Sequence, residues 1–361
     1  MKRVFNFYAG PSTLPVSVLE KIRDEIVEFR GLGLSIIETS HRSSEYEEIH
    51  NRAIVDLREI FGIPDGYEVL FLGGGATLQF SMVPLNFLDS SSSCDLVLSG
   101  SWAKKAMSDA KKVGKVNVLF DGSAQKFSTL PNPAEIKPSA GSRYVHITSN
   151  ETIDGLQWQQ YPDTGAVPLI VDMSSDILSR PVDVSRFAMI YAGAQKNIGP
   201  AGLTLVIIRK DLLERCNPNL TAYLNYKTHA TGNSLYNTPP VFSIYAAGLV
   251  LQWIKNEGGL PAVTERNRKK ASLIYDAIDT SDGFYRCPVD RVYRSMMNVV
   301  FRLKTEALEE QFLKIAEAKG MLGLPGHRSV GGCRASLYNA LPVEGAQELA
   351  QLMKDFAKAN G

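Results

Sequence analysis

The chain has 361 residues, of which 44% are hydrophobic and 21% charged. This length predicts about two domains, each with its own core. The 39 Lys and Arg residues nearly balance the 38 Asp and Glu residues, which leaves a formal net charge of +1 at pH 7 and excludes a global field that recruits nucleic acid or anionic membranes, so any anion-binding site must be local.

The N-terminal part is predicted to contain two amphipathic helices. Apolar residues between positions 19 and 29 recur at helical spacing ahead of two glycines. A second helix is predicted from Ser44, which begins a capping-box pattern, to Gly62. The polar loop between the two helices carries His41 and Arg42. The second helix therefore holds this pair on a fixed loop.

A glycine run follows the first predicted strand, residues 67–72. Gly73, Gly74 and Gly75 lie between this strand and an apolar helix that ends near residue 87, and Ala76 and Thr77 come directly after them. Such a turn presents free backbone N–H groups and the positive end of a helix dipole to an anion such as phosphate. The spacings typical of dinucleotide-binding and P-loop motifs are absent. The alternative is a glycine-rich turn needed only for packing.

Further strands are predicted at residues 95–99, 116–120, 143–148, 169–172, 188–191 and 203–208. Several of them are separated by helix-length segments, which is typical of a mostly parallel sheet covered by helices on both faces. In such sheets, ligands bind beyond the carboxyl ends of the strands. The residues that follow those ends include Trp102, Thr152, Asp172 and Lys196.

Lys196 is the first candidate for chemistry. It lies in a tight connection between two predicted strands, among three glycines that permit close approach to a ligand. A desolvated lysine loses proton affinity and becomes the amine nucleophile that Schiff-base chemistry requires. If the strand ending at Asp172 is the neighbour, a carboxylate and an amine face one cavity, as pyridoxal phosphate requires. The alternative is an exposed lysine on a surface loop.

The rest of the chain predicts a second, smaller α/β domain. Residues 216–240 are irregular and polar, and residues 241–254 form an apolar helix too short to span a membrane. Two glycines at 258 and 259 mark a boundary, after which helices and strands alternate. We expect a large domain at 15–256, a small C-terminal domain at 257–361, and an N-terminal segment, 1–14, that packs near the active site.

The cysteines indicate a reducing compartment. All four lack C-x-x-C spacing and do not cluster with histidines, which disfavours both a zinc site and a disulfide framework. No apolar segment typical of a signal peptide follows the N-terminus. We therefore expect a cytoplasmic protein without a structural metal.

Long segments of the chain resemble the phosphoserine aminotransferases, a family in the class V branch of the fold type I aminotransferases. The segments are NFYAGP at 6–11, SHRS at 40–43, GGG at 73–75, GAQKNIGPAG at 193–202, YNTPP at 236–240 and GHRSVGGCRASLYNA at 326–340. The resemblance implies an α/β fold of type I, in which a large domain with a mostly parallel, seven-stranded sheet is joined to a smaller C-terminal α/β domain. It also implies that pyridoxal 5'-phosphate is the cofactor.

The same resemblance implies roles for individual residues around the cofactor. Lys196 forms the Schiff base, Asp172 pairs with the pyridine nitrogen, and Trp102 stacks on the ring. The residues expected at the polar ring substituents and at the phosphate are Thr152, Ala76, Thr77 and Gln195. Asn237 and Thr238 are expected to reach the cofactor phosphate of the partner subunit, which makes a homodimer necessary for activity.

Two His-Arg pairs, His41-Arg42 and His327-Arg328, occur in a chain with only five histidines, and Arg334 follows nearby. Arginine binds planar carboxylates and phosphates through its fork of donors. Such a cluster in one cavity suits a small, multiply anionic substrate, whereas the alternative for each arginine is a surface ion pair. The resemblance assigns these residues to the carboxylate and phosphate of the substrate. Some relatives carry an Arg where this chain has Ala76-Thr77, so one phosphate contact is missing or supplied elsewhere.

The resemblance implies reversible transfer of the amino group of L-glutamate to 3-phosphohydroxypyruvate, which gives O-phospho-L-serine and 2-oxoglutarate in L-serine biosynthesis. It also admits the 4-phosphohydroxythreonine step of pyridoxine biosynthesis. The alternatives are a class V aminotransferase for another keto acid, a cysteine desulfurase, for which only Cys333 is a candidate nucleophile, and a catalytically silent protein that binds the cofactor.

Overall fold

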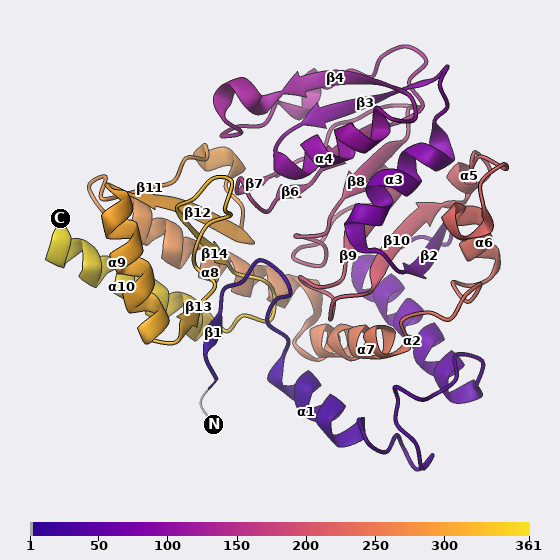
Figure 1. Cartoon of the computed structure of the whole chain (residues 1–361), viewed down its shortest axis with the longest axis horizontal. Coiled ribbons are helices and arrows are strands. Elements are labelled where there is room, and N and C mark those ends of the chain that lie inside the picture. The colour runs from indigo at the N-terminus through magenta and orange to yellow at the C-terminus, as the bar shows by residue number, and fades with distance from the viewer. Residues whose placement is uncertain (1–2) are drawn as a thin grey trace.

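A computed structural model describes residues 3–361. A central sheet of seven strands carries the fold (Figure 1). The five strands from β9 to β4 run parallel to one another, whereas β10 runs antiparallel to both of its neighbours. The predicted mostly parallel sheet is therefore confirmed. In spatial order the strands are β2 (Tyr67–Leu72), β10 (Thr204–Arg209), β9 (Met189–Gly193), β8 (Leu169–Asp172), β5 (Val145–Thr148), β3 (Ser93–Leu98) and β4 (Lys115–Asp121).

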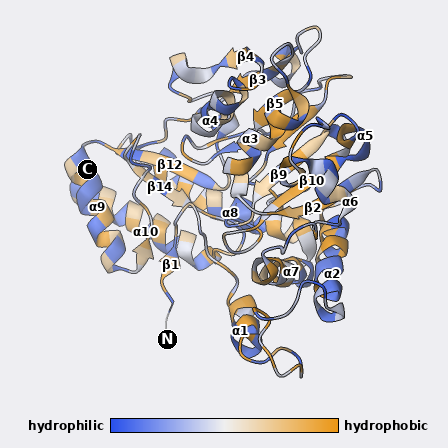
Figure 2. Ribbon diagram, turned by 45° about the vertical axis from the view of Figure 1, so that its right-hand side comes forward, coloured by the Kyte–Doolittle hydropathy of each residue, from blue (hydrophilic) through white to orange (hydrophobic). Residues whose placement is uncertain are grey.

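Helices cover both faces of this sheet. On one face lie α2 (Ser44–Phe61) and α7 (Val241–Asn256), which pack against each other, with α1 (Val16–Glu25) against α7. On the other face lie α3 (Gly75–Phe87) and α4 (Ser101–Ala110). The inner strands β8, β9 and β10 are buried on both faces and are therefore mostly apolar, as the orange colour of β9 and β10 in Figure 2 shows. The edge strand β4 is not buried. No helix within residues 3–361 is long and apolar enough to cross a membrane.

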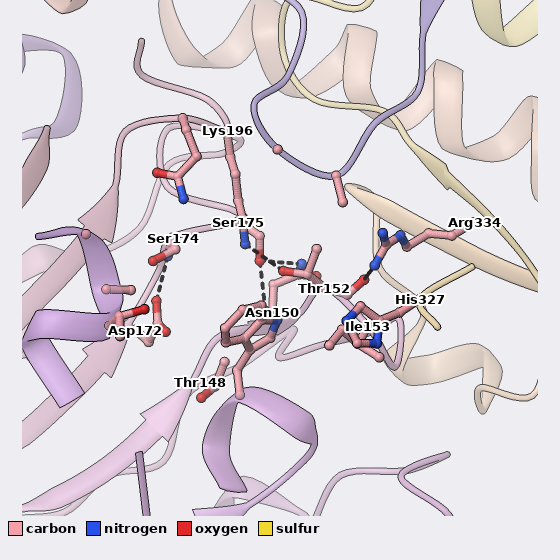
Figure 3. A pocket seen from close by; sticks show the side chains of 17 residues that line it. Thr148, Asn150, Thr152, Ile153, Asp172, Ser174, Ser175, Lys196, His327 and Arg334 are labelled. Carbon is pink, nitrogen blue, oxygen red and sulfur yellow. Dashed lines mark hydrogen bonds between the residues drawn. The ribbon is translucent and has the colours of Figure 1, made fainter. Parts of the chain in front are cut away.

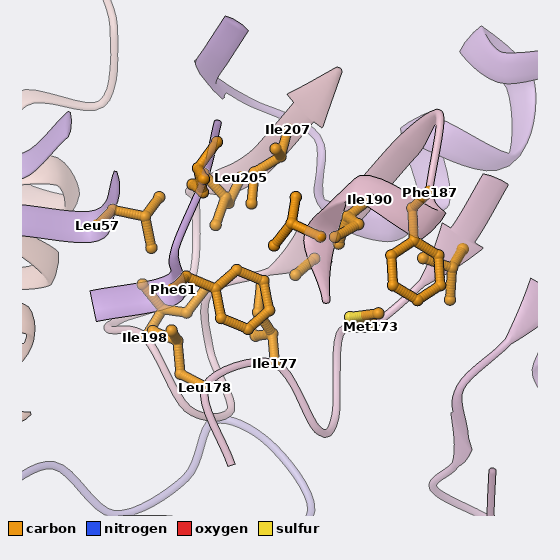
Figure 4. Packing of buried hydrophobic residues seen from close by; sticks show 14 of the residues in the cluster. Leu57, Phe61, Met173, Ile177, Leu178, Phe187, Ile190, Ile198, Leu205 and Ile207 are labelled. Atoms are coloured by element: carbon orange, nitrogen blue, oxygen red, sulfur yellow. The ribbon is translucent and has the colours of Figure 1, made fainter. Parts of the chain in front are cut away.

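Successive residues of each strand contribute to two separate cores. In β9, Ile190 packs into the cluster under α2 and α7, and Tyr191 packs into the cluster under α3 and α4. Figure 4 shows Leu57 and Phe61 of α2 approaching Ile190 and the residues of β10. Each such side chain contributes about 1.5–3 kcal/mol when fully buried. These cores fix the strand ends at which the site is built.

Local sequence explains where the helices next to the site begin and end. The Ser43 hydroxyl accepts the Tyr46 N–H at the start of α2, and Gly62 ends this helix in the left-handed conformation. Gly74 precedes α3 with a φ of 83°, a conformation that strongly favours glycine. A Cβ at this position would also lie 2.5 Å from the Cβ of Leu78.

One segment predicted to be irregular contains a helix. Within residues 216–240, α6 (Tyr226–Thr231) begins at Asn225, whose side chain accepts the Lys227 N–H. Tyr226 and His229 are buried on its inner face. Six residues are too few for a helical period to stand out in the sequence, which is why the prediction missed this helix. The short helix α5 (Lys210–Leu213) follows β10 directly.

The elements after residue 258 share a core of their own, which joins the aromatic rings of Tyr285, Phe301, Phe312 and Phe356. They comprise a three-stranded sheet in the order β11 (Tyr285–Arg286), β12 (Asn298–Leu303) and β14 (Cys333–Ser336), with α8 (Gly259–Asp279), α9 (Glu306–Ala318) and α10 (Val343–Asn360). The boundary at 256/257 stays a prediction.

The N-terminal segment joins this C-terminal unit before it reaches the central sheet. Strand β1 (Phe5–Asn6) pairs in parallel with β13 (Met321–Leu322), and Phe7 is buried in the same core. The chain then passes the connection after β9, where the Ser12 N–H donates to the Gln195 carbonyl over 2.9 Å. Residues 1 and 2 of the predicted segment 1–14 lie outside the described residues.

Candidate active site

A cavity of ≈ 290 Å³ lies beyond the carboxyl ends of β5, β8 and β9 (Figure 3). Its walls come from the central sheet, the starts of α3 and α4, the N-terminal segment and the loop before β14. Nine of the fourteen predicted site residues line it: Ala76, Thr77, Trp102, Thr152, Asp172, Gln195, Lys196, His327 and Arg334.

Lys196 reaches the cavity from the connection after β9. Its Nζ donates a hydrogen bond of 2.7 Å to Oγ1 of Thr152. Burial lowers the pKa of Lys196 to about 8; the charge of Asp172 opposes this shift, and that of Arg334 adds to it. A substantial fraction of the amine is therefore neutral near physiological pH, as a nucleophile or a general base must be.

Asp172 ends β8, the parallel neighbour of β9. Its carboxyl group is buried, and Oδ1 accepts the Ser174 N–H over 2.9 Å. Burial raises the pKa of Asp172, while the hydrogen bonds from Ser174 and the charge of Lys196 lower it. The predicted adjacency of the two strand ends is confirmed, and an anion and an amine line one cavity.

The start of α3 forms an anion cradle in the same cavity. No side chain caps this helix, and Gly75, Ala76 and Thr77 of its first turn all line the cavity. The first N–H groups of a helix have no partner within the helix and carry its positive dipole end. A phosphate group fits this position without any basic side chain.

Trp102 lies in the first turn of α4, and its ring centroid is 5.5 Å from Nζ of Lys196. Within residues 3–361, the buried atoms Nε1 of Trp102 and Oγ1 of Thr148 have no hydrogen-bond partner, and both residues line the cavity. Buried polar atoms normally have hydrogen-bond partners, so a ligand with polar substituents would fit next to these two atoms. An aromatic face, an amine, a carboxylate and an anion cradle together fit pyridoxal phosphate.

Residues 4–349 match the model of the class V aminotransferases. The phosphoserine aminotransferase of Lysinibacillus sphaericus (strain C3-41) is 54% identical over 355 residues, which cover 98% of each chain. The chain belongs to the phosphoserine aminotransferase family. The family member from Niallia circulans is 52% identical over 360 residues, which cover 100% of this chain and 99% of the relative.

Solved structures of the family have the same fold. The phosphoserine aminotransferase of Bacillus circulans subsp. alkalophilus matches with a TM-score of 0.98 and 51% identity, over 100% of both chains. The pyridoxal-phosphate-bound phosphoserine aminotransferase of Trichomonas vaginalis matches with a TM-score of 0.89 and 37% identity, over 98% of this chain and 100% of that one. The predicted fold type is therefore confirmed.

One side of the cavity is cationic. Arg334, on β14, donates to the Thr152 carbonyl over 3.3 Å, and His327 lines the wall near it. Burial and then the charges of Arg334, Arg328 and Lys105 lower the pKa of His327. This wall suits a carboxylate or phosphate.

Five predicted site residues do not line the cavity within the described chain: His41, Arg42, Asn237, Thr238 and Arg328. Arg42 is exposed on the loop before α2, and Asn237 and Thr238 are exposed between α6 and α7. Their proposed contacts stay predictions.

The structure also brings residues to the cavity that the sequence analysis did not single out. Ser174 and Ser175 follow Asp172 directly, and Asn150 donates from Nδ2 to Oγ of Ser175 over 2.8 Å. Gly10 packs against the connection after β9. The only signal in the sequence was the run of small polar residues after two buried strands. Residues at such positions either bind a ligand or form hydrogen bonds to neighbouring residues.

Proposed function

We propose that this chain catalyses the reversible transfer of an amino group from L-glutamate to 3-phosphohydroxypyruvate, yielding O-phospho-L-serine and 2-oxoglutarate, with pyridoxal phosphate as its cofactor. This reaction is the amino-transfer step of L-serine biosynthesis. The observation that carries the proposal is the meeting of Lys196, Asp172 and Arg334 around one cavity. Family membership supports the same reaction.

Each wall of the cavity has a task in this reaction. Pyridoxal phosphate, when bound, accepts electrons from the bond broken at the substrate Cα and carries the amino group between the two substrates. The first turn of α3 would hold its phosphate, Trp102 would cover its ring, and Asp172 would hold the proton on its ring nitrogen. Lys196 Nζ removes the proton from the substrate Cα and returns it later, which its lowered pKa permits near neutral pH.

The cationic wall selects the substrate. Arg334 can bind a carboxylate in a bidentate manner, and His327 contributes a donor beside it. The phosphate of 3-phosphohydroxypyruvate requires more positive charge than these two residues provide. Because His41 and Arg42 do not line the cavity of their own chain, their proposed substrate contact requires a second subunit that brings this loop to the cavity.

A homodimer would cover apolar side chains next to the predicted site residues. Ile37, on the loop before α2, and Tyr236, beside Asn237, are 60% and 54% exposed. In the proposed dimer, Asn237 and Thr238 reach the cofactor phosphate of the partner subunit. The expected cytoplasmic location also belongs to this proposal.

A cysteine desulfurase is less compatible with the structure. Such an enzyme needs an accessible thiolate on a mobile loop, but burial raises the pKa of all four cysteines. Cys333, the one candidate in the sequence, is buried in strand β14.

The proposal is tested by a coupled assay that compares 3-phosphohydroxypyruvate with hydroxypyruvate as amino acceptor, with L-glutamate as donor. We expect kcat/KM to fall by at least about 100-fold without the phosphate, because one charge-assisted contact contributes about 1.5–3 kcal/mol and several are lost. Equal values for the two acceptors would exclude a phosphate site. The absence of visible absorbance by a lysine-bound cofactor would exclude the cofactor chemistry itself.

A further inference from the structure

Glu151 is a buried carboxyl group that the proposed reaction does not use. It ends the short strand β6 (Asn150–Glu151), which pairs with β7 (Leu156–Gln157), and its side chain is 1% exposed. Burying a carboxyl group costs free energy unless hydrogen bonds compensate for lost hydration. The hydrogen bonds of Glu151 should therefore have a structural or functional role.

Both oxygens of Glu151 bind the start of α4. Oε2 accepts the Trp102 N–H over 2.9 Å, and Oε1 accepts the Ala103 N–H over 3.0 Å and the Ser99 hydroxyl over 3.1 Å. These N–H groups belong to the first turn, where the helix supplies no acceptor of its own. A residue 49 positions along the chain from Trp102 thus caps the helix that carries this ring.

The two chain neighbours of Glu151 make hydrogen bonds at the cavity. The next residue, Thr152, accepts the hydrogen bond from Lys196 Nζ over 2.7 Å and offers its carbonyl to Arg334. The preceding residue, Asn150, donates to Ser175 and to Asn298 over 2.8 Å each. The backbone around Glu151 is therefore held from several sides, and its side chain connects that fixed loop to α4.

The glycine before α4 makes room for this contact. Gly100 has a φ of 176°, an extended conformation open to any residue. A Cβ here would lie 2.5 Å from Cδ of Glu151 and 2.7 Å from Oδ2 of Asp154. The position requires glycine because two carboxyl groups occupy the space of a side chain.

Asp154 completes the arrangement. Its Oδ2 accepts the Ser101 N–H over 2.9 Å, so successive N–H groups of the first turn of α4 bind two carboxyl groups of one loop. Burial and the neighbouring Asp154 raise the pKa of Glu151. Burial also raises the pKa of Asp154. Placing two buried carboxyl groups side by side is electrostatically unfavourable, and the hydrogen bonds from the first turn of α4 offset part of this cost.

We propose that Glu151 is a positioning residue that fixes the Trp102 ring relative to Thr152 and Lys196. The distance between the ring and the Thr152–Lys196 pair, which form two walls of the cofactor site, is thereby held constant. The inference rests on the proposed role of Trp102 as a wall of the cofactor site. It differs from that role in that Glu151 touches neither cofactor nor substrate and acts only through the first turn of α4.

The test compares Glu151→Ala, Glu151→Gln and Gly100→Ala with a matched control, Thr305→Ala. Thr305 caps α9, where its hydroxyl accepts the Leu308 N–H over 3.3 Å, and it does not line the cavity. Two properties are measured on each full-length variant: the dissociation constant for pyridoxal phosphate, and hydrogen exchange of the Trp102 and Ala103 amides in the cofactor-free chain.

We expect all three site variants to exchange these two amides faster. Glu151→Ala and Gly100→Ala should weaken cofactor binding by about tenfold, the lower end of the effect measured when a hydrogen-bond partner of a metal ligand is lost. Glu151→Gln keeps one oxygen acceptor and should fall between wild type and Glu151→Ala. Thr305→Ala should leave both properties unchanged although it lowers the melting temperature.

A double-mutant cycle separates positioning from stability. If Glu151 acts through Trp102, Glu151→Gln should have little further effect on cofactor affinity in a Trp102→Ala background. Additive effects, or unchanged cofactor affinity in Glu151→Gln and Gly100→Ala despite faster amide exchange, would overturn the proposal. Because amide exchange is measured without cofactor, failure of the proposed reaction would leave that result intact and is distinguished by the acceptor assay.

Discussion

Nζ of Lys196 lies 2.7 Å from Oγ1 of Thr152, and the carbonyl of the same threonine accepts a hydrogen bond from Arg334 (Figure 3). One residue thus holds both the amine of the reaction and the cation proposed to bind the substrate carboxylate. This arrangement places a second positive charge near the lysine. It therefore links substrate recognition to the protonation of Lys196.

The first prediction concerns the Lys196 amine. Because burial lowers its pKa from 10.5 to about 8, it should be fully protonated well below pH 8 and neutral well above it. In the cofactor-free chain, labelling by an amine-acylating reagent, followed by mass spectrometry, should rise through a midpoint near pH 8. A lysine in a model peptide has a pKa of about 10.4 and would be labelled about two pH units later. A midpoint near 10.5 for Lys196 would contradict the desolvated environment.

The second prediction concerns Arg334→Gln. The charge of Arg334 lowers the pKa of Lys196, so its removal should move the labelling midpoint upward. KM for glutamate should also rise by about tenfold or more, since a charge-assisted bidentate contact is lost. A suitable control is Arg291→Gln, which removes an exposed ion pair with Asp279 and should change neither value. An unchanged KM in Arg334→Gln would remove this residue from the substrate site.

The third prediction concerns Asp172→Asn, which keeps the size of the side chain. Loss of its charge should lower the pKa of Lys196 further, since that charge opposes the shift. Turnover should fall by about 100-fold or more, because an amide cannot hold a proton on the cofactor ring. A variant with a normal turnover number would exclude the proposed pairing.

The same substitution predicts a pH dependence of stability. Burial raises the folded-state pKa of Asp172 above its unfolded value, so its contribution to stability is present below the unfolded pKa of about 4 and is lost as pH rises through the folded value. The wild-type chain without cofactor should therefore lose stability relative to Asp172→Asn as pH rises above about 4. Urea unfolding at several pH values measures this difference.

The sequence predicted the elements whose signal is local. The strand 67–72 and the strand ending at Asp172 have the predicted bounds, because short apolar runs between glycines and polar residues mark buried strands. That Asp172 and Lys196 face one cavity was a hypothesis that depended on the two strands being neighbours, and the structure shows that they are. Their polar or charged side chains at strand ends were visible without any knowledge of the packing.

The rest depended on contacts between distant residues. In the sequence, Glu151 cannot be distinguished from the other polar residues that follow a strand. Only the structure shows that it caps α4. Strands β6 and β7 have two residues each, too few for any periodicity. In the proposed homodimer, His41 and Asn237 would reach the cavity of the partner subunit, and the packing of two subunits is not specified by a local pattern in one chain.

The fourth prediction concerns Lys270, which is fully buried in α8. Its Nζ donates to the carbonyls of Leu337, Tyr338 and Leu341. Burial holds the pKa of Lys270 well below its ordinary value. Lys270→Met removes the Nζ donor from all three carbonyls, of which, within the described chain, only that of Tyr338 keeps a second donor, the Leu341 N–H. The substitution should lower the free energy of unfolding by about 3 kcal/mol.

The control for this prediction is Lys269→Met, since Lys269 is the exposed neighbour on the same helix. It should change stability by less than about 0.5 kcal/mol. Denaturant titration of the three proteins gives the comparison. Equal stability of Lys270→Met and wild type would mean that water or a backbone shift satisfies the carbonyls.

The fifth prediction tests the proposed dimer through hybrid subunits. Arg42→Ala and Lys196→Ala homodimers should both be nearly inactive, the first because it lacks a substrate cation and the second because it lacks the base. In a hybrid dimer, one cavity combines an intact Lys196 with Arg42 of the partner subunit. A 1:1 mixture that exchanges subunits should recover about one quarter of the wild-type activity, because half of the dimers are hybrids with one complete cavity each.

The same mixture distinguishes the alternatives. If Arg42 served the cavity of its own chain, each cavity of the hybrid would lack either Arg42 or Lys196, and mixing would restore nothing. A mixture of Lys196→Ala with Arg334→Gln is the matched control, because Arg334 lines the cavity of its own chain. The activity of that mixture should not exceed the activities of its two parent variants. If only the mixture that contains Arg42→Ala recovers activity, the loop before α2 serves the cavity of the partner subunit.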